Sequence, residues 1–483
     1  MAMFGRARGI HFVGIGGIGM SGIAELLVNL GYGVSGSDAK KSEITERLQS
    51  LGARIAIGHA AENIGDADVV VVSSAVKADN PEVLAARARH TPVIPRAEML
   101  AELMRLRFGI AIAGAHGKTT TTSMVAWMLE RAGLDPTAVI GGRLSAFGSN
   151  ARLGAGPLMV AEADESDRSF LKLSPSIAVI TNIDREHMEA YGTFDRVLDA
   201  FVDFADKVPF YGAVVACIDD ENVRAMLPRF SRRVITYGFS EDADVRGIDA
   251  STDGRAGRCR VAYQVPGHPD GAGVGSITVS VPGTHNLQNA LAAVAVGVEL
   301  GVPFDKMAAA LAEFRGADRR YQIKGEAAGV TVVDDYGHHP TEIAAVLKAA
   351  RAGSPSRLVA VFQPHRYTRT RDLLPEFGRA LADADLTVLT DIYPAGEAPI
   401  PGILSAAIAD EIRKQNRGAV EAVVPLDELP KRVAALAQEG DVVLTLGAGS
   451  ISAVGDLILK ELGTKQHAER GTRNVELGSG RAM

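Results

Sequence analysis

Cysteine, tryptophan and long apolar runs are scarce or absent in this chain. Its 483 residues include 2 cysteines, Cys217 and Cys259, and 1 tryptophan. So few cysteines argue against a disulfide scaffold or a cysteine-built metal site, and they favour a reducing compartment. No apolar run reaches the roughly 20 residues that cross a bilayer. We therefore expect a cytoplasmic protein without a membrane partner.

An excess of positive charge is also absent. The chain has 51 lysines and arginines against 58 aspartates and glutamates, a net charge of −7. This balance argues against a general affinity for nucleic acid or for anionic membranes, so any anion must be bound by a local pocket. No pattern in the sequence decides between a monomer and a homodimer.

What is present is an alternation of apolar, strand-like runs with helical patterns along most of the chain. This rhythm is typical of α/β folds with parallel sheets. The length favours about three domains. We expect a Rossmann-like domain at 1–106, a central P-loop ATPase-like parallel sheet at 107–318 and a Rossmann-like domain at 319–463. Within the central domain, residues 240–280 are expected to form hairpins at a sheet edge, and the polar tail 464–483 is expected to be disordered.

A glycine-rich loop follows the apolar run Phe108–Ala113 and leads into a helical pattern. The loop and the first helical residues are Gly114, Ala115, His116, Gly117, Lys118, Thr119 and Thr120. Glycines let backbone N–H groups face phosphate oxygens, a lysine reaches the β and γ phosphates, and a threonine hydroxyl binds Mg²⁺. Ile112 occupies the place of the usual first glycine, so the motif is a shortened form. The loop predicts binding of ATP with Mg²⁺, through a lysine that we expect to be exposed.

A second glycine motif lies near the N-terminus, between a strand-like run and a helical pattern. Its residues are Gly14, Gly16, Gly17, Ile18 and Gly19, and Asp38 follows about twenty residues later, as in dinucleotide-binding folds. The motif alone favours NAD, yet any nucleotide diphosphate satisfies the same physics at a helix N-terminus. Three polar residues are candidates for the same cleft: Ser73, Ser74 and Arg96.

Two strand ends in the central domain carry candidate metal ligands. Glu162 follows the apolar run Leu158–Ala161, and a carboxylate at the end of a strand beside a phosphate loop suits Mg²⁺. His187 stands shortly after the next strand, as a candidate for a second cation site.

In the third domain, polar residues again follow apolar runs. Asp335, Tyr336 and His338 come after Val330–Val333, and Arg366 and Arg369 come after the run that ends at Phe362. Pro340 suits the first position of a helix, and Glu342 suits its first turn. The two arginines are suited to an α-carboxylate or to a transferring phosphoryl group.

Together these stretches resemble the Mur ligases of bacterial cell-wall synthesis. The similar stretches are HFVGIGGIGMSGIA, AGAHGKTTTT, EADESDRSFL, TNIDREHMEAYG, GTHNLQNALAA, DDYGHHPTE and QPHRYTRTRDL, in this order between residues 11 and 373. The resemblance implies ATP-driven formation of an amide between the lactyl carboxylate of UDP-N-acetylmuramate and the amino group of L-alanine.

The resemblance also implies roles for individual residues. Lys118 and Thr119 would hold the ATP phosphates, with Thr119 and Glu162 on one Mg²⁺ and His187 on a second. The adenine side would be formed by His285, Asn286 and Asn289, with Asp335 and Tyr336 near the ATP. His338, Arg366 and Arg369 would form the amino-acid pocket, and the first glycine motif would hold the UDP-sugar. Lys207 stands near the position of a modified lysine in other Mur ligases, but this branch is expected to lack that feature.

Rival hypotheses use the same motifs. A related ligase that attaches a preformed peptide to the same UDP-sugar would differ only in its amine pocket. An NAD-dependent dehydrogenase with an added ATPase domain would explain the first glycine motif alone. A regulatory ATP-binding module without chemistry would need only the second.

Overall fold

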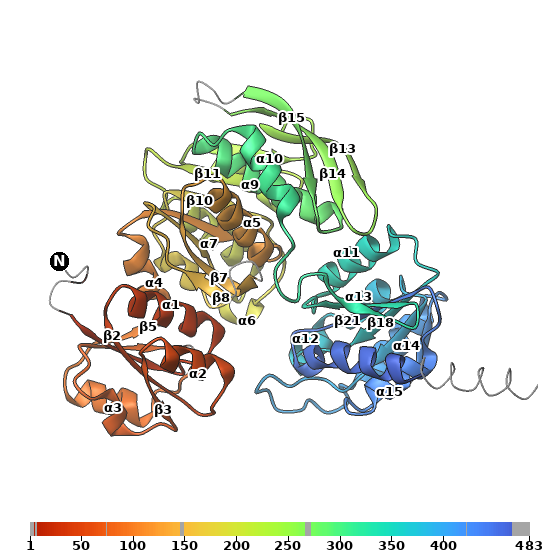
Figure 1. Cartoon of the computed structure of the whole chain (residues 1–483), viewed down its shortest axis with the longest axis horizontal. Coiled ribbons are helices and arrows are strands. Elements are labelled where there is room, and N and C mark those ends of the chain that lie inside the picture. The colour runs from red at the N-terminus through yellow and green to blue at the C-terminus, as the bar shows by residue number, and fades with distance from the viewer. Residues whose placement is uncertain are drawn as a thin grey trace, which may run out of the picture. The chain divides into compact units, whose positions relative to one another are not determined.

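The computed structural model describes residue 4 and residues 7–73, 75–144, 149–265, 272–421 and 423–465. The chain divides into two compact units. The first runs to Ala250 and includes Arg258–Val279 and Asn286–Ala317, while the second comprises Ser251–Gly257, Ser280–His285 and the chain from Asp318 onward. The five-stranded and ten-stranded sheets belong mainly to the first unit, and a six-stranded sheet to the second (Figure 1).

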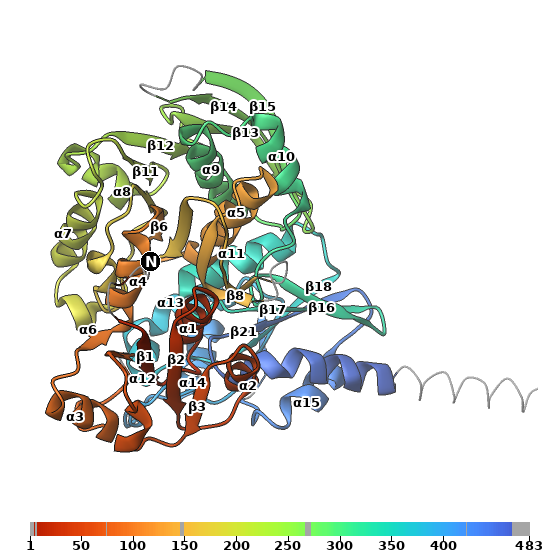
Figure 2. The ribbon, with the colours of Figure 1, turned by 60° about the vertical axis from the view of Figure 1, so that its left-hand side comes forward.

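The first sheet is fully parallel and has the strand order β3-β2-β1-β4-β5. Its strands are β1 (Gly9–Val13), β2 (Gly33–Asp38), β3 (Arg54–Ile57), β4 (Val69–Val72) and β5 (Val93–Pro95). Its helices are α1 (Ile18–Asn29), α2 (Glu43–Ser50), α3 (Pro81–Ala88) and α4 (Arg96–Met104), with the 3₁₀ turn η1 (Ala61–Ile64). Figure 2 shows β1, β2 and β3 side by side. The order reverses between β1 and β4, which is where parallel sheets open a crevice for ligands.

The ten-stranded sheet has the order β15-β14-β13-β12-β11-β10-β6-β9-β7-β8. Its strands are β6 (Phe108–Ala113), β7 (Thr137–Leu144), β8 (Ser149–Arg152), β9 (Leu158–Glu162), β10 (Ile177–Ile180), β11 (Ala213–Cys217), β12 (Val234–Gly238), β13 (Val245–Thr252), β14 (Gly257–Gln264) and β15 (Ala272–Val279). β6 lies between β9 and β10 and is parallel to both, and its residues after Phe108 are buried, as is typical of a strand inside a parallel sheet. The strands expected in residues 240–280 do form one edge of this sheet.

Helices and 3₁₀ turns connect these strands. They are α5 (Lys118–Arg131), η2 (Ser169–Lys172), α6 (Met188–Tyr191), α7 (Phe194–Ala205), α8 (Glu221–Met226), η3 (Leu227–Arg229), α9 (Thr284–Glu299) and α10 (Phe304–Glu313). One hydrophobic cluster extends from the first sheet into the ten-stranded sheet and includes Phe12, Ile23, Ala151 and Phe201. Gly22 of α1 lies against Ala151 of β8, where an added Cβ would come within 3.2 Å. The absence of a side chain at Gly22 therefore lets α1 approach the second sheet.

The six-stranded sheet has the order β16-β17-β21-β18-β19-β20, with only β16 antiparallel to its neighbour. Its strands are β16 (Gln322–Ala327), β17 (Val330–Asp335), β18 (Arg357–Phe362), β19 (Leu386–Leu389), β20 (Ala419–Glu421) and β21 (Asp441–Leu446). Its helices are α11 (Pro340–Arg351), α12 (Tyr367–Asp372), α13 (Leu374–Leu381), α14 (Ser405–Lys414), α15 (Leu429–Leu436) and residues 454–465, with the 3₁₀ turn η4 (Ser450–Ala453). Pro340 begins α11 and Glu342 lies in its first turn, as the sequence predicts.

The fold is α/β with parallel-rich sheets, which confirms the expected class. The proposed domain limits at 106 and 318 stay predictions, since the first two sheets share one compact unit. Residues 464 and 465 continue the last helix, and the rest of the expected tail, from 466, lies outside the described residues. Within the described part of the chain, every helix is too short or too polar to cross a membrane.

Candidate nucleotide and substrate sites

The loop after β6 has a backbone that only glycine adopts easily. Gly114 has a φ of +137° and Gly117 a φ of +81°. A Cβ at Gly114 would lie 2.1 Å from the hydroxyl oxygen of Thr181, so a side chain there has no room. Glycine is therefore required at Gly114 both by conformation and by the close approach of the neighbouring strand.

The residues after β10 hold this loop in shape. The N–H of His116 donates to Oδ1 of Asn182 at 2.7 Å, and the hydroxyl of Thr181 donates to the His116 carbonyl at 2.6 Å. The N–H of Ala115 donates to the Asn182 carbonyl at 3.1 Å. No sequence pattern predicts a role for Thr181 or Asn182, although both stand where the strand beside the loop ends.

Lys118 is not the exposed lysine that the sequence suggests. Its side chain is 15% exposed, and Nζ donates to Oε1 of Glu165 at 2.8 Å and to the carbonyl of Gly114 at 2.6 Å. Burial disfavours the ammonium, but the carboxylates of Glu165 and Glu162 outweigh this effect and raise the pKa of Lys118. The expectation of exposure is wrong because a buried carboxylate from another strand end meets the loop.

Two glutamates stand at the end of β9, Glu162 as its last residue and Glu165 just after it, and they have different surroundings. Oε2 of Glu162 accepts the N–H of Gly141 at 2.9 Å. Glu165 is buried, and burial raises its pKa to about 7 against the opposing effect of Lys118. The hydroxyl of Tyr191 donates to the Glu165 carbonyl at 2.6 Å and so fixes this part of the backbone.

His187 lies with Glu165 and Glu186 in a cluster suited to a cation. Its Nε2 is 3.4 Å from Oε2 of Glu186 and 3.7 Å from Oε1 of Glu165, and one ligand atom from each residue lies within 4.8 Å of the others. Burial disfavours the imidazolium, but Glu186 and Glu165 outweigh this effect and raise the pKa of His187. Oε2 of Glu165 is buried without a hydrogen-bond partner. Two carboxylates and an imidazole fit a divalent cation.

Asn289 of α9 lies beside the phosphate loop. A Cβ at Gly117 would come within 2.7 Å of its Oδ1, and its Nδ2 donates to Oδ1 of Asn286 at 3.3 Å. His285 is assigned to the other compact unit, where burial and the charge of Arg320 lower its pKa to about 4.

The first glycine motif forms the loop between β1 and α1. Gly14 has a φ of +79°, and the N–H of Gly16 donates to Oδ2 of Asp38 at 2.9 Å. Ile18 begins α1 directly after Gly17, so the loop leads into a helix N-terminus, which is suited to an anion. Ser74 lies outside the described residues.

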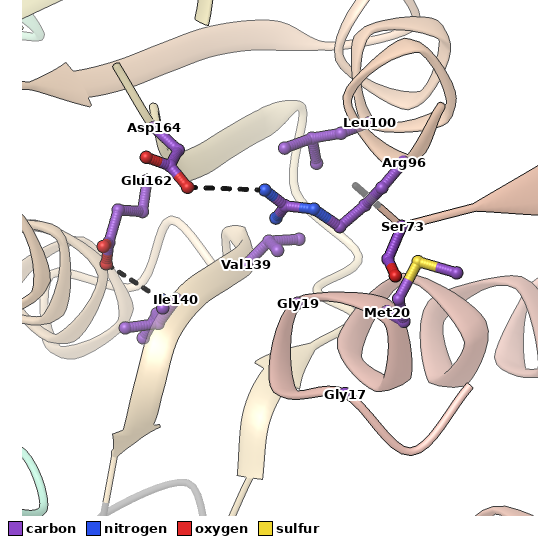
Figure 3. A pocket seen from close by; sticks show the side chains of 11 residues that line it. Gly17, Gly19, Met20, Ser73, Arg96, Leu100, Val139, Ile140, Glu162 and Asp164 are labelled. Atoms are coloured by element: carbon purple, nitrogen blue, oxygen red, sulfur yellow. Dashed lines mark hydrogen bonds and ion pairs between the residues drawn. The ribbon is translucent and has the colours of Figure 1, made fainter. Parts of the chain in front are cut away.

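A cavity of about 270 Å³ joins this loop to the end of β9 (Figure 3). Its lining comes from Gly17, Gly19, Met20, Ser73, Arg96 and Leu100 on one side and from Val139, Ile140, Gly141, Glu162 and Asp164 on the other. Nη2 of Arg96 is 3.7 Å from Oδ2 of Asp164, and a Cβ at Gly19 would come within 2.6 Å of the same guanidinium. The structure thus brings predicted UDP-sugar residues and the predicted metal ligand Glu162 to one cavity, while Asp38 is outside its lining.

In the second unit, β17 ends in a buried carboxylate, that of Asp335. Asp335 accepts the N–H groups of Tyr321 at 2.7 Å and Gly337 at 2.6 Å, and burial raises its pKa to about 6. The guanidinium carbons of Arg319 and Arg320 each lie 5.0 Å from the centre of the Tyr336 ring. Such contacts between cations and an aromatic ring are favourable.

The residues after β18 meet those after β17. The ring of His365 lies 5.6 Å from that of His338 and stacks on Tyr393 at 5.5 Å between ring centres. Nη1 of Arg369 is 3.4 Å from Nδ1 of His365, and the N–H of Arg366 donates to the Tyr393 carbonyl at 2.8 Å. Burial and the nearby positive groups lower the pKa of His365 to about 3.

These contacts bring together the predicted residues His338 and Arg369 and place Arg366 beside Tyr393. They also identify His365, Tyr393, Arg319 and Arg320, which the sequence left without a role. His365 stands inside the quoted stretch QPHRYTRTRDL, and the arginine pair stands at the predicted domain boundary.

Each of the three sheets carries polar residues at the ends of its strands. The first has a glycine loop where its strand order reverses, the second a phosphate loop whose lysine pairs with a carboxylate, and the third a group of histidine, arginine and tyrosine side chains. These features define an ATP-using α/β enzyme. Models of the Mur ligase catalytic, middle and glutamate ligase domains match residues 9–108, 112–297 and 319–449. The chain belongs to the Mur ligase family.

Named relatives and solved structures agree with this assignment. The chain is 55% identical to a UDP-N-acetylmuramate--L-alanine ligase of Geobacter sp. strain M21, over 95% of this chain and 99% of the relative. It is 56% identical to a ligase of the same name from Anaeromyxobacter dehalogenans, over 95% and 99%. The crystal structure of UDP-N-acetylmuramate-alanine ligase from Thermotoga maritima matches with a TM-score of 0.78 and 31% identity, over 94% of this chain and 99% of that one. The crystal structure of a murein peptide ligase from Psychrobacter arcticus matches with a TM-score of 0.70 and 25% identity, over 94% of this chain and 99% of that one.

Proposed function

We infer that this chain is an ATP-dependent ligase of peptidoglycan precursor synthesis. It joins L-alanine to the lactyl carboxylate of UDP-N-acetylmuramate through an acyl phosphate. The observation that carries this inference is the 55% identity to L-alanine ligases over 95% of the chain, because it extends through the loops of all three sheets. Since the reaction uses ATP, we place it in the cytoplasm, with the enzyme as a monomer or a homodimer.

The cavity of Figure 3 supports an arrangement for the UDP-sugar. Its diphosphate rests on the N-terminus of α1, at Gly14, Gly16, Gly17, Ile18 and Gly19, where the free N–H groups and the helix dipole favour anions. Asp38 accepts a nucleoside hydroxyl, as the acidic residue of such motifs does. Arg96 and the turn at Ser73 and Ser74 then guide the lactyl group toward Glu162.

The phosphate loop and the residues around it bind ATP in this proposal. The N–H groups of Gly114, Ala115, His116, Gly117, Thr119 and Thr120 face the phosphates. Lys118 exchanges the carbonyl of Gly114 for a γ-phosphate oxygen, so its charge offsets the charge that develops during phosphoryl transfer. Asn286 and Asn289, in the same unit as the loop, bind the adenosine.

Magnesium is the expected metal, and the residues fit it. Thr119 and Glu162 would hold one ion and His187 a second, and the closeness of Glu165 and Glu186 to His187 supports them as further ligands of the second ion. When bound, Mg²⁺ supplies positive charge that stabilises the transferring phosphoryl group.

The amine substrate binds on the second unit. Arg366 and Arg369 receive its α-carboxylate, with His338 beside them, since paired guanidinium groups suit a carboxylate. His365 remains neutral beside them because its pKa is lowered to about 3, so it adds no further charge to the pocket. The amine then attacks the acyl carbon and phosphate leaves.

Phosphate release in the presence of ATP and Mg²⁺ tests the proposed function. We expect release that requires both UDP-N-acetylmuramate and L-alanine, and that falls to background when either is omitted. Glycine, L-serine and a murein tripeptide serve as alternative amines, and NAD with each substrate tests for hydride transfer. Release that is independent of the amine, or faster with the tripeptide than with L-alanine, would contradict the proposal.

A further inference from the structure

The carboxylate of Glu82, on α3, is buried near the carboxyl ends of the strands of the first sheet. The residue is 0% exposed, Oε2 accepts the hydroxyl of Ser37 at 2.5 Å, and Oε1 accepts Nδ2 of Asn63 at 2.5 Å. The N–H of Ala60 also donates to Oε1, at 3.3 Å. All three donors come from segments far from α3 in the sequence.

Burying an ionised carboxylate costs free energy, so we asked what the buried carboxylate of Glu82 contributes. Burial opposes ionisation, but the imidazole of His11, 3.6 Å away, and hydrogen bonds from Ser37 and Asn63 outweigh it and lower the pKa of Glu82 to about 2. The side chain is therefore a carboxylate at neutral pH. A buried charge of this kind stabilises a fold less than apolar packing of the same volume does. None of the binding or chemical steps proposed above uses this side chain.

Glu82 links elements on both sides of the point where the strand order of the first sheet reverses. α3 follows β4, on one side of the point where the strand order reverses, whereas Ser37 lies on β2 and Ala60 and Asn63 follow β3, on the other side. Ligands bind in the crevice that opens at such a point. A single carboxylate therefore joins the two halves of the sheet below the crevice.

The same contacts lead directly to the glycine loop. The carbonyl of Ser37 accepts the N–H groups of Gly14 at 2.8 Å and Ile15 at 3.0 Å. The neighbouring Asp38 accepts Gly16 through its side chain at 2.9 Å and Gly58 through its carbonyl at 2.8 Å.

The donor and acceptor roles around Ser37 are also determined. A carboxylate only accepts, so the Ser37 hydroxyl donates to Glu82 and its oxygen accepts from Nδ1 of His59, 2.9 Å away. Glu82 thereby orders the ends of β2 and β3 together.

We propose that Glu82 is a positioning residue for the UDP-sugar: it holds the ends of β2 and β3 in the arrangement that the glycine loop needs to bind the nucleotide diphosphate. Glu82 itself touches no substrate. The inference rests on the proposed binding of UDP-N-acetylmuramate at this loop.

The test compares two affinities in the variant Glu82→Gln. Calorimetric titration with UDP-N-acetylmuramate should show a dissociation constant raised by about tenfold, the size expected when one hydrogen bond to a charged group is lost. The dissociation constant for ADP with Mg²⁺, which binds at the other loop, should stay within twofold of the wild-type value. Ser37→Ala should weaken the UDP-sugar selectively as well, and the double variant should lose less than the product of both single effects.

Glu102→Gln is the matched control, since Glu102 lies on α4 in an exposed ion pair with Arg105. It should leave both affinities unchanged. If folded Glu82→Gln binds the UDP-sugar within twofold of wild type, or if both ligands weaken equally, the inference is overturned. Should Glu82→Gln fail to fold, Ser37→Ala decides by the same criteria. A wild-type protein that binds no UDP-sugar would instead overturn the proposed function, and the inference with it.

Discussion

At the scale of single residues, the pair formed by Lys118 and Glu165 matters most for the proposed chemistry. Each side chain is mostly buried, and each compensates the charge of the other. In our proposal, nucleotide phosphates take the lysine and leave Glu165 beside His187 and Glu186, the cluster suited to a cation. The pair would thus connect phosphate binding to cation binding.

Lys118→Ala should abolish turnover and also destabilise the protein. We expect kcat to fall by about 100-fold or more, because a charge aimed at the transferring phosphoryl group is lost. The free energy of unfolding should fall by about 1–3 kcal/mol, because Glu165 loses its buried partner. Urea unfolding can be followed by the fluorescence of Trp127, the single tryptophan, which lies on α5.

The double variant Lys118→Ala with Glu165→Gln separates the two effects. Stability should recover, since no buried charge is left alone, while turnover should stay lost. Lys172→Ala is the control, because Lys172 forms an exposed pair with Glu98 and should change stability by less than about 0.5 kcal/mol. A double variant no more stable than the single one would contradict this account of the pair.

At the scale of elements, the glycine loop after β6 is held by the adjoining end of β10. The contacts of Thr181 and Asn182 fix the carbonyl and N–H of His116 before any nucleotide binds. Preorganised N–H groups lose less entropy when they take up a phosphate.

Gly114→Ala should therefore destroy the loop rather than merely strain it. The added methyl would meet Thr181 at 2.1 Å, so we expect the free energy of unfolding to fall by about 2–4 kcal/mol. The affinity for ADP, measured by calorimetry, should fall by about tenfold or more.

Gly133→Ala is the matched control for Gly114→Ala. Gly133 has a φ of +88° and nothing within 4 Å of an added Cβ. The free energy of unfolding should therefore fall only through backbone strain, by about 1 kcal/mol. Its ADP affinity should equal that of wild type. If both variants bind ADP equally well, the loop does not depend on its contact with Thr181.

Elements of this kind are also what sequence patterns predict best. The run Phe108–Ala113 is found as β6 with the same bounds, because an apolar run between turn residues leaves few alternatives. The hairpin of β7 and β8 has no comparable pattern and was not expected. The sequence does not predict the contact of Lys118 with Glu165 or that of Glu82 with Ser37. The residues of these pairs are 47 and 45 positions apart, and packing rather than a local pattern decides such contacts.

At the scale of the whole chain, three sheets supply three sets of loops at the ends of their strands. In our proposal each set receives one reactant: the UDP-sugar at the first sheet, ATP at the second and L-alanine at the third. An acyl phosphate is hydrolysed readily, so it must be formed and used in one water-poor place. In our proposal, the cavity between the first glycine loop and the end of β9 brings the first two reactants together.

Transfer of a lactyl oxygen to the released phosphate is the direct sign of an acyl phosphate. UDP-N-acetylmuramate labelled with ¹⁸O in its lactyl carboxylate is incubated with ATP, Mg²⁺ and L-alanine, and the released phosphate is examined by ³¹P NMR. The carboxylate oxygen attacks the γ-phosphorus, and its bond to carbon breaks when the amine attacks, so each released phosphate should contain one ¹⁸O. Formation of the amide with unlabelled phosphate would contradict the account.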